Sequence, residues 1–250
     1  MEKFLFLDLD DTVFQTRRKC SSLEGAIPAS YNLQGEVSSY CLPKQQQLLR
    51  VLDEQWRIIP TTARTRAAYQ RVDLAVNFND GAIVNHGATI INETGSEDEV
   101  WWQQLEPQLA QLQTLFVDLE QQIKQFAKQQ QFDIMTRMIN ETGLDYYLEV
   151  RHNQALSAEL QQLLSHCINP LLQNFEGVFD SHLNSNSLTI LPCIINKTHA
   201  VNYRINQLKE HYGEIITMGM GDSLSDAAFI SLCDYAMIPK ATQLHQQLMP

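Results

Sequence analysis

Three carboxylates stand directly after the first apolar run of this chain. Four large apolar residues occupy positions 4–7, and Asp8, Asp10 and Asp11 follow within four positions. A short apolar run of this kind is typical of a buried strand. Carboxylates crowded at a buried strand end raise one another's pKa, so they cannot all stay ionised unless a cation is bound among them.

A second apolar run, at positions 215–220, is also followed by acids, Asp222 and Asp226. In an open parallel sheet the carboxyl ends of the strands form one crevice in which ligands bind. If the two runs are neighbouring strands, Asp8, Asp10, Asp222 and Asp226 converge on one small volume. Oxygen ligands without a nearby histidine or cysteine cluster favour Mg²⁺ over zinc.

A lysine and a threonine add an anion-binding character to this predicted site. Lys197 opens a predicted helix, where a cation opposes the helix dipole at a cost of about 0.3–1 kcal/mol unless an anion is bound there. Thr61 and Thr62 follow another short apolar run, at positions 57–60, and enter a helix whose N-terminal amides also favour anions. Carboxylates, a cation, a lysine and a hydroxyl together indicate phosphoryl transfer.

Short apolar runs that alternate with helical patterns must position these residues, and this alternation predicts a parallel α/β sheet. Helices are expected over residues 43–56, with Pro43 in the first turn, and over 65–74. Buried strands are expected at 57–60, where Pro60 requires a strand end or a sheet edge, and at 81–84. A further helix is expected from Asn196 as N-cap to Gly213 as its stop.

The sequence pattern changes in the middle of the chain. A glutamine-rich stretch, 101–131, has apolar residues at spacings of three and four, which predicts one long amphipathic helix with Pro107 in or near its first turn. Two strand-like runs follow at 133–139 and 145–152, with a turn at 140–143. A helix over 155–175, kinked or broken at Pro170, and two more strands around a turn at 184–186 complete the stretch. The prediction is therefore a Rossmann-like α/β core, residues 1–92 and 188–250, with an inserted α+β cap, residues 93–187.

Composition excludes several classes of protein. The chain has 250 residues, is 44% hydrophobic and carries a formal net charge of −11, with no Lys/Arg-rich block, so no nucleic-acid partner is expected. Five scattered cysteines without CxxC pairs indicate buried thiols in a reducing cytoplasm, not a disulfide framework or a zinc site. Neither a signal peptide nor a membrane span is visible, so a cytoplasmic protein without a membrane partner is expected.

Four short motifs resemble those of the haloacid dehalogenase (HAD) superfamily of aspartate-nucleophile phosphohydrolases. They occur in the family's order as DLDDT (8–12), TAR (62–64), the helix-opening Lys197 and GDSLSD (221–226). The position and pattern of the insert resemble the larger cap class, which includes sucrose-phosphate and mannosyl-phosphoglycerate phosphatases and the phosphomannomutases. Two departures are Ala63 in place of the usual glycine and a longer chain from 14 to 42, part of which is expected to form an extended flap near the cap.

The resemblance implies a role for each matched residue. Asp8 would be the nucleophile and form an aspartyl-phosphate, and Asp10 would be the general acid and base. Mg²⁺ would be held by the Asp8 carboxylate, the Asp10 main-chain carbonyl and Asp222, with Asp226 as a further ligand or an orienting group. Thr62 and Lys197 would bind phosphoryl oxygens.

Some assignments stay open at this point. Thr61 is an alternative to Thr62, and Asp226 is an alternative helix-start acid without a metal role. Asp11 is expected to be a solvated turn residue and Arg64 a structural partner rather than a substrate contact. The tryptophans at 101 and 102 would anchor a helix in the cap core or, alternatively, line a sugar site.

The expected function is Mg²⁺-dependent hydrolysis of a small phosphorylated metabolite, a sugar phosphate or a phosphoglycerate-type ester. A phosphomutase would share the same residues and return the phosphoryl group to its substrate. The third candidate is a catalytically inactive binding or regulatory protein on the same fold.

Overall fold

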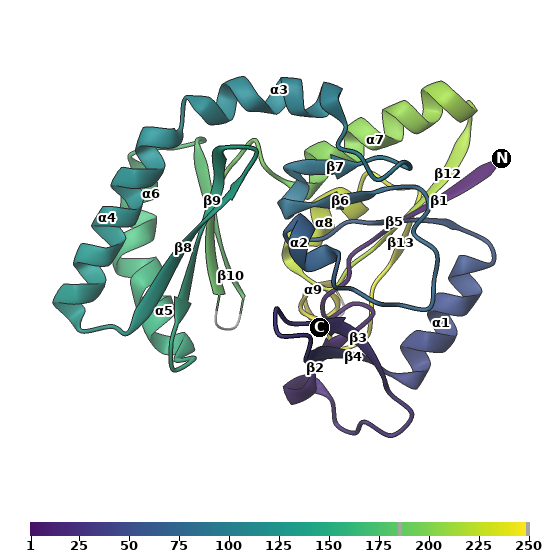
Figure 1. Cartoon of the computed structure of the whole chain (residues 1–250), viewed down its shortest axis with the longest axis horizontal. Coiled ribbons are helices and arrows are strands. Elements are labelled where there is room, and N and C mark those ends of the chain that lie inside the picture. The colour runs from purple at the N-terminus through teal and green to yellow at the C-terminus, as the bar shows by residue number, and fades with distance from the viewer. Residues whose placement is uncertain (185–186, 249–250) are drawn as a thin grey trace. The chain divides into compact units, whose positions relative to one another are not determined.

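The protein's structure is a computed structural model that describes residues 1–184 and 187–248 (Figure 1). The chain divides into two compact units, which we call unit 1 (Met1–Trp101 with Asn196–Pro250) and unit 2 (Trp102–Ile195). These divisions lie several residues beyond the expected 92/93 and 187/188. They lie later because Trp101 is buried against unit 1, and because residues 187–192 form a strand of the sheet of unit 2.

Unit 1 contains a four-stranded parallel sheet with the order β13-β12-β1-β5. The first strand of the chain lies between two strands distant in sequence, and β5 ends at Pro60 on one side of this sheet, as its proline requires. The strands are β1 (Glu2–Leu7), β5 (Arg57–Pro60), β12 (Ile215–Met220) and β13 (Tyr235–Met237).

Both faces of this sheet are buried, as is usual for parallel sheets. Phe4 and Phe6 of β1 belong to one apolar cluster, and Leu5 and Leu7 belong to another, because successive side chains of a strand point to opposite faces. Figure 1 shows the helices of unit 1 around the sheet. They are α1 (Pro43–Asp53), α2 (Arg66–Tyr69), α7 (Lys197–Tyr212), α8 (Leu224–Ile230) and α9 (Gln243–Leu248).

The helix predicted over 65–74 is wrong in length, because only α2 forms there. Thr65 caps it by accepting a hydrogen bond from the Ala68 amide, and the chain turns after Tyr69. Pro43 occupies the first turn of α1 as expected. Asn196 caps α7 through the His199 amide, and Gly213, with φ of 73°, ends it.

Two smaller sheets complete unit 1. The long segment after the first strand forms an antiparallel sheet with the order β2-β4-β3, which we call the inserted sheet (residues 15–41). A hairpin, β6 with β7, follows α2, and β6 lies beside the end of β5 through the bridge Thr61–Ile83. The elements are β2 (Gln15–Thr16), the 3₁₀ turn η1 (Arg17–Lys19), β3 (Ile27–Tyr31), β4 (Val37–Cys41), β6 (Ala82–Val84), the 3₁₀ turn η2 (Asn85–Gly87) and β7 (Thr89–Ile91).

Unit 2 is an α+β domain with its own apolar core. Its antiparallel sheet has the order β10-β11-β9-β8 and is covered by helices. Together with the parallel sheet of unit 1, it confirms the predicted fold class. The elements are α3 (Glu99–Ala110), α4 (Gln113–Gln130), β8 (Ile134–Glu141), β9 (Leu144–His152), α5 (Ser157–Leu163), the π-helical turn η3 (Leu164–Ile168), α6 (Asn169–Gln173), β10 (Phe179–Asn184) and β11 (Ser187–Pro192).

The single helix predicted over 101–131 is wrong, because the chain breaks between α3 and α4. Pro107 lies inside α3 instead of in its first turn, and its ring removes one backbone donor only a few residues before the break. The helix expected over 155–175 does not break at Pro170: helical backbone continues from α5 through the π-helical turn η3 into α6, and the irregularity is η3, just before the proline.

The turn between β8 and β9 forms where it was expected. Thr142 and Gly143 both have positive φ, 54° and 86°, which is the backbone twist that favours a tight hairpin. The turn predicted at 184–186 includes residues 185–186, which lie outside the described residues.

Among the helices that the structure describes, none is both long enough and apolar enough to cross a membrane. All five cysteines lie among the described residues and none of them forms a disulfide; Cys20, Cys41 and Cys167 are buried. Burial raises the pKa of the Cys41 thiol to about 11, so it stays protonated at neutral pH.

Candidate active site

The carboxyl ends of β1, β5 and β12 lie level with one another. Leu7 pairs with Met220 on one side and with Pro60 on the other. The Asp8 amide donates to the Met220 carbonyl at 2.9 Å, and the Thr61 amide donates to the Leu7 carbonyl at 2.7 Å. The residues that follow these three strands therefore share one edge of the sheet, as the sequence predicts.

Three of the predicted acids meet at this edge. One carboxylate oxygen from each of Asp8, Asp222 and Asp226 lies within 4.8 Å of the other two. Asp8 is 5% exposed and Asp226 is fully buried. The Thr12 hydroxyl donates to Asp8 Oδ2 at 2.9 Å and also lies 3.4 Å from Asp222 Oδ1, so it connects the two strand ends.

Lys197 lies against two of these acids. Its Nζ is 2.6 Å from Asp8 Oδ1 and 2.7 Å from Asp226 Oδ1, and its side chain is 9% exposed. Lys197 is the first residue of α7, where its positive charge interacts unfavourably with the helix dipole. The negative charges of the two carboxylates offset this interaction. Burial works to lower the pKa of Lys197, but Asp226 and Asp8 together raise it, so the ammonium stays charged.

The acids do not titrate alike. Burial raises the pKa of Asp8 to about 8 against the opposing effect of Lys197. Burial and the Asp226 charge raise the pKa of Asp222 to about 6. Burial also acts on Asp226, but Lys197 and hydrogen bonds from Ser223 hold its pKa below the usual range.

The donor set of this site fits a hard divalent cation. Three ionised carboxylates and one ammonium leave a charge of about −2, which a divalent ion would balance and which would return the raised pKa values toward normal. The nearby oxygens belong to Asp8, Asp222 and Asp226. Carboxylate oxygens are the ligands that Mg²⁺ prefers.

Asp226 is held by the start of α8. Ser223 and Asp226 form a capping box, in which the Asp226 carboxylate accepts from the Ser223 amide at 3.0 Å and from its hydroxyl at 2.6 Å. Gly221 makes this approach possible, because a Cβ at this position would lie 2.6 Å from the Asp226 Cβ. Asp226 therefore both caps the start of α8 and lies in the acidic cluster, so the two alternatives considered for it do not exclude each other.

The Asp10 side chain lies outside the carboxylate cluster and is held by Arg64. Arg64 Nε donates to Asp10 Oδ2 at 2.6 Å and Nη2 donates to Asp10 Oδ1 at 2.8 Å. The expected metal contact of Asp10 was its main-chain carbonyl, so this side-chain pairing does not conflict with it. Asp11 lies in a left-handed turn, with φ of 60°, and forms an ion pair with Lys19.

The two threonines after β5 differ in how their hydroxyls are used. Thr61 Oγ1 donates to the Ile59 carbonyl at 3.2 Å, so its proton is directed back to the strand. Thr62 Oγ1 accepts from the Arg64 amide at 3.1 Å, which uses a lone pair and not the proton. Of the two, Thr62 is therefore the better donor to an anion.

Sequence reasoning missed two of the side chains that shape this site. Thr12 belongs to the first motif, and this position in the sequence could have suggested that it contacts the acids of the site. Ser30, which contacts Arg64 at 3.3 Å, lies in the inserted sheet and carries no sequence signal. Trp101 anchors α3, as one alternative predicted, but it does so in a core cluster of unit 1 and not in the core of the inserted unit: its Nε1 donates to the Gly87 carbonyl at 3.1 Å.

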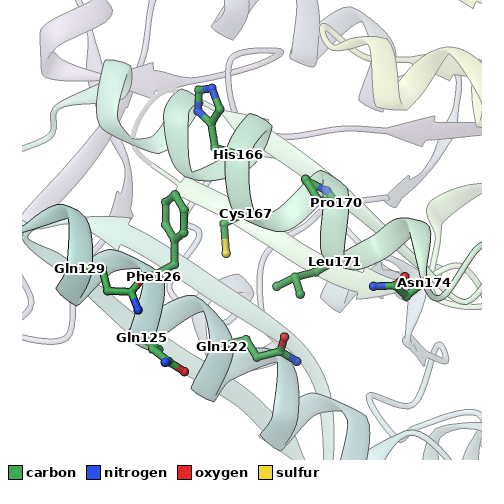
Figure 2. Close-up of a pocket in the computed structure, with 9 residues that line it drawn as sticks. All are labelled: Gln122, Gln125, Phe126, Gln129, His166, Cys167, Pro170, Leu171 and Asn174. Carbon is green, nitrogen blue, oxygen red and sulfur yellow. The ribbon is translucent and has the colours of Figure 1, made fainter.

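A separate groove lies in unit 2, between α4 and the η3–α6 segment (Figure 2). It has a volume of about 360 Å³, and its lining includes neither a carboxylate nor a lysine or arginine. Such a lining cannot bind a metal and a phosphoryl group in the way that the edge of the parallel sheet can. The residues drawn in Figure 2 are Gln122, Gln125, Phe126, Gln129, His166, Cys167, Pro170, Leu171 and Asn174.

Comparison of sequences finds no matching family model and no matching curated protein. Comparison of structures finds the sucrose-phosphatase of Synechocystis sp. PCC6803, in complex with sucrose and phosphate, at a TM-score of 0.56. The two sequences are 14% identical, and the match covers 99% of this chain and 96% of that one.

The C-terminal domain of trehalose-6-phosphate phosphatase from C. albicans matches at a TM-score of 0.55 and 15% identity, over 92% of this chain and 73% of that one. A trehalose-6-phosphate phosphatase related protein matches at a TM-score of 0.52 and 16% identity, over 96% of this chain and 88% of that one. These similarities show a shared fold: this chain has the fold of the sucrose-phosphatase and trehalose-6-phosphate phosphatase structures, as the resemblance drawn from the four motifs implied.

Proposed function

We propose that this protein is a Mg²⁺-dependent phosphatase that hydrolyses a small phosphorylated metabolite. One observation carries the proposal: Asp8, Asp222 and Asp226 converge within 4.8 Å at the carboxyl edge of a parallel sheet, with Lys197 bonded to two of them. A site with this composition stabilises a phosphoryl group that bears negative charge during transfer. Asp8, Asp222 and Asp226 would hold Mg²⁺, which supplies charge neutralisation when bound.

The reaction proceeds in two displacements. A carboxylate oxygen of Asp8 attacks phosphorus, the bond to the ester oxygen breaks, and Asp10 gives its proton to that leaving oxygen. Asp10 then takes a proton from water as the water attacks the aspartyl-phosphate, which releases inorganic phosphate and regenerates Asp8. Lys197 and Thr62 bind the phosphoryl oxygens in both displacements.

A sugar phosphate is the substrate class that we favour, with a phosphoglycerate-type ester as the alternative. The support is the shared fold with a sucrose-phosphatase and with trehalose-6-phosphate phosphatases. We also propose that unit 2 is the cap that excludes water and selects the leaving group. This role follows from the place of the insertion between the second and third motifs.

Phosphate release from a panel of sugar phosphates and phosphoglycerates in the presence of Mg²⁺ tests the proposal. Asp8→Asn should lower turnover by at least about 10³-fold, because the nucleophile is lost. Asp11→Asn is the matched control: Asp11 lies in the same loop with φ of 60°, a conformation that asparagine tolerates, and it should retain activity within about threefold. Chelation should abolish release and added Mg²⁺ should restore it.

The same assay separates the other two candidates. A phosphomutase would need a bisphosphate activator and would release no net phosphate, and an inactive binding protein would release none from any compound. Equal phosphate release by the wild type and by Asp8→Asn would contradict the assignment of the nucleophile.

A further inference from the structure

The inserted sheet, residues 15–41, is linked to the proposed site by the side chain of Arg64. Arg64 belongs to the loop after β5, and its guanidinium donates two hydrogen bonds to Asp10, at 2.6 and 2.8 Å. The same Nη2 also donates to the hydroxyl of Ser30, on strand β3 of the inserted sheet, at 3.3 Å. Three segments that are distant in sequence therefore meet at this guanidinium.

The surroundings of Arg64 restrict its position. Its guanidinium carbon lies 5.0 Å from the centre of the Phe14 ring, within reach of a cation–π contact. Nη1 lies 3.4 Å from the Ala68 carbonyl. The Arg64 side chain is 16% exposed, and Ser30 is fully buried. A hydroxyl in a dry environment with a second contact, to Ser38 at 2.8 Å, is a fixed support for the guanidinium.

Asp10, by contrast, needs an external support. Its side chain is 46% exposed and follows the end of β1 in a loop, so its own packing does not select one rotamer. A planar guanidinium fork that contacts both carboxylate oxygens fixes the orientation of the carboxylate as well as its place. A general acid that is misplaced by about 1 Å can lose as much as about 10²-fold in rate, so this restraint is large enough to affect catalysis.

We propose that Arg64 is a positioning residue for Asp10, and that Ser30 of the inserted sheet, together with Phe14 just before that sheet, holds Arg64 in place. This inference rests on the proposed role of Asp10 as the general acid. It assigns a function to the long segment after the first strand: the segment supports the group that gives the proton to the leaving oxygen.

Two model esters of nearly the same shape give the test a readout that a purely structural role would not change. Phenyl phosphate needs protonation of its leaving oxygen much more than p-nitrophenyl phosphate does, because p-nitrophenolate is the better leaving group. The measured quantity is kcat/KM, which reports the displacement by Asp8. Arg64→Met should lower kcat/KM about tenfold or more for phenyl phosphate and at most about threefold for p-nitrophenyl phosphate.

Three further variants connect the effect to the proposed contacts. Arg64→Lys keeps the charge without the fork and should lie between the wild type and Arg64→Met on phenyl phosphate. Ser30→Ala should lower kcat/KM for phenyl phosphate about threefold, and Val37→Ala, which alters an exposed position of the same sheet, should leave it unchanged. If Arg64→Met does not fold, Arg64→Lys and Ser30→Ala carry the test.

A double-mutant comparison decides whether Arg64 acts through Asp10. In an Asp10→Asn background, Arg64→Met should have no further effect on phenyl phosphate, because the acid is already lost. An equal loss on both esters, or a full further loss in that background, would overturn the inference. Failure of the proposed function looks different, because the wild type would then hydrolyse neither ester in an Asp8-dependent way.

Discussion

Asp222 lies two residues beyond the end of β12, and one of its carboxylate oxygens is within 4.8 Å of oxygens of Asp8 and Asp226. Burial and the neighbouring charges raise its pKa to about 6. The folded protein without metal therefore binds more protons at Asp222 than the unfolded chain does between about pH 4 and pH 6. The free energy of unfolding therefore falls as pH rises through that interval. Above about pH 6 the ionised Asp222 destabilises the fold to its full extent.

Replacement of this acid should therefore stabilise the protein while it removes activity. Without metal, Asp222→Asn should have a free energy of unfolding higher than the wild type by roughly 1–3 kcal/mol at pH 7.5, and the difference should vanish near pH 3.5. Mg²⁺ should raise the Tm of the wild type, because it binds the folded state, and should have little effect on the variant. Thermal unfolding at both pH values, with and without Mg²⁺, measures this; a variant less stable than the wild type at pH 7.5 would contradict it.

Asp234 provides a matched control with the opposite sign. Its carboxylate accepts hydrogen bonds from the amide and the hydroxyl of Thr217, both at 2.8 Å, and these bonds lower its pKa. A carboxyl with a lowered pKa stabilises the fold above its unfolded value and loses that effect as pH falls through its folded value. Asp234→Asn should therefore be destabilising at pH 7.5 and nearly neutral at pH 2.5, with no change in the response to Mg²⁺.

The start of α7 shows how one glycine fixes a helix that carries a functional side chain. Gly87, in η2, has φ of 102°, and a Cβ there would lie 2.4 Å from the Asn196 carbonyl oxygen. Asn196 caps α7, and Lys197 is the next residue. A side chain at position 87 would therefore push the first turn of α7, and with it Lys197, away from Asp8.

Gly87→Ala should lower the free energy of unfolding by about 3 kcal/mol or more, from backbone strain and the collision together. It should also lower kcat, because Lys197 is displaced. Gly95→Ala is the control: its φ is 81°, but a Cβ there has open space, so only about 1–2 kcal/mol of strain is expected, with kcat unchanged. Chemical denaturation and the phosphatase assay measure both effects. Equal losses of stability and of kcat in the two variants would show that the contact between position 87 and α7 does not affect stability or catalysis.

The elements differ in how far the sequence could predict them. The cap and the stop of α7 carry local signals, Asn196 and Gly213, and both were predicted correctly. The motifs also placed Asp8, Asp222 and Asp226 together, because acids after parallel strands converge whatever the loops do. The break between α3 and α4 was missed, because the apolar periodicity runs through it without interruption.

The pairing of Asp10 with Arg64 was missed for a different reason. These residues are separated by 54 positions, and Arg64 meets Asp10 and Ser30 only through tertiary packing. Short-range patterns contain no information about a side-chain contact of this kind. The inserted sheet was likewise foreseen only as an extended segment, since its strands pair with a register that shifts twice.

The two residues of unit 1 that flank unit 2 in sequence, Trp101 and Asn196, both lie at Gly87. Trp101 donates from Nε1 to the Gly87 carbonyl, and the Asn196 carbonyl lies against the Gly87 Cα. Unit 1 has two apolar clusters of its own around its parallel sheet, and unit 2 has a separate cluster between its sheet and helices. A continuous segment whose ends meet in the parent fold, and which buries its own core, has the character of an inserted domain.

Each unit should therefore fold without the other. Replacement of residues 102–195 by a short Gly/Ser linker should leave a cooperatively unfolding chain that still binds Mg²⁺ and hydrolyses p-nitrophenyl phosphate in an Asp8-dependent way. Its preference among sugar phosphates should be lost, because the proposed cap is absent. Residues 102–195 alone should show near-UV circular dichroism and a single unfolding transition. A linker variant that folds and keeps the selectivity of the full chain would contradict the cap assignment, because selectivity would then arise within unit 1.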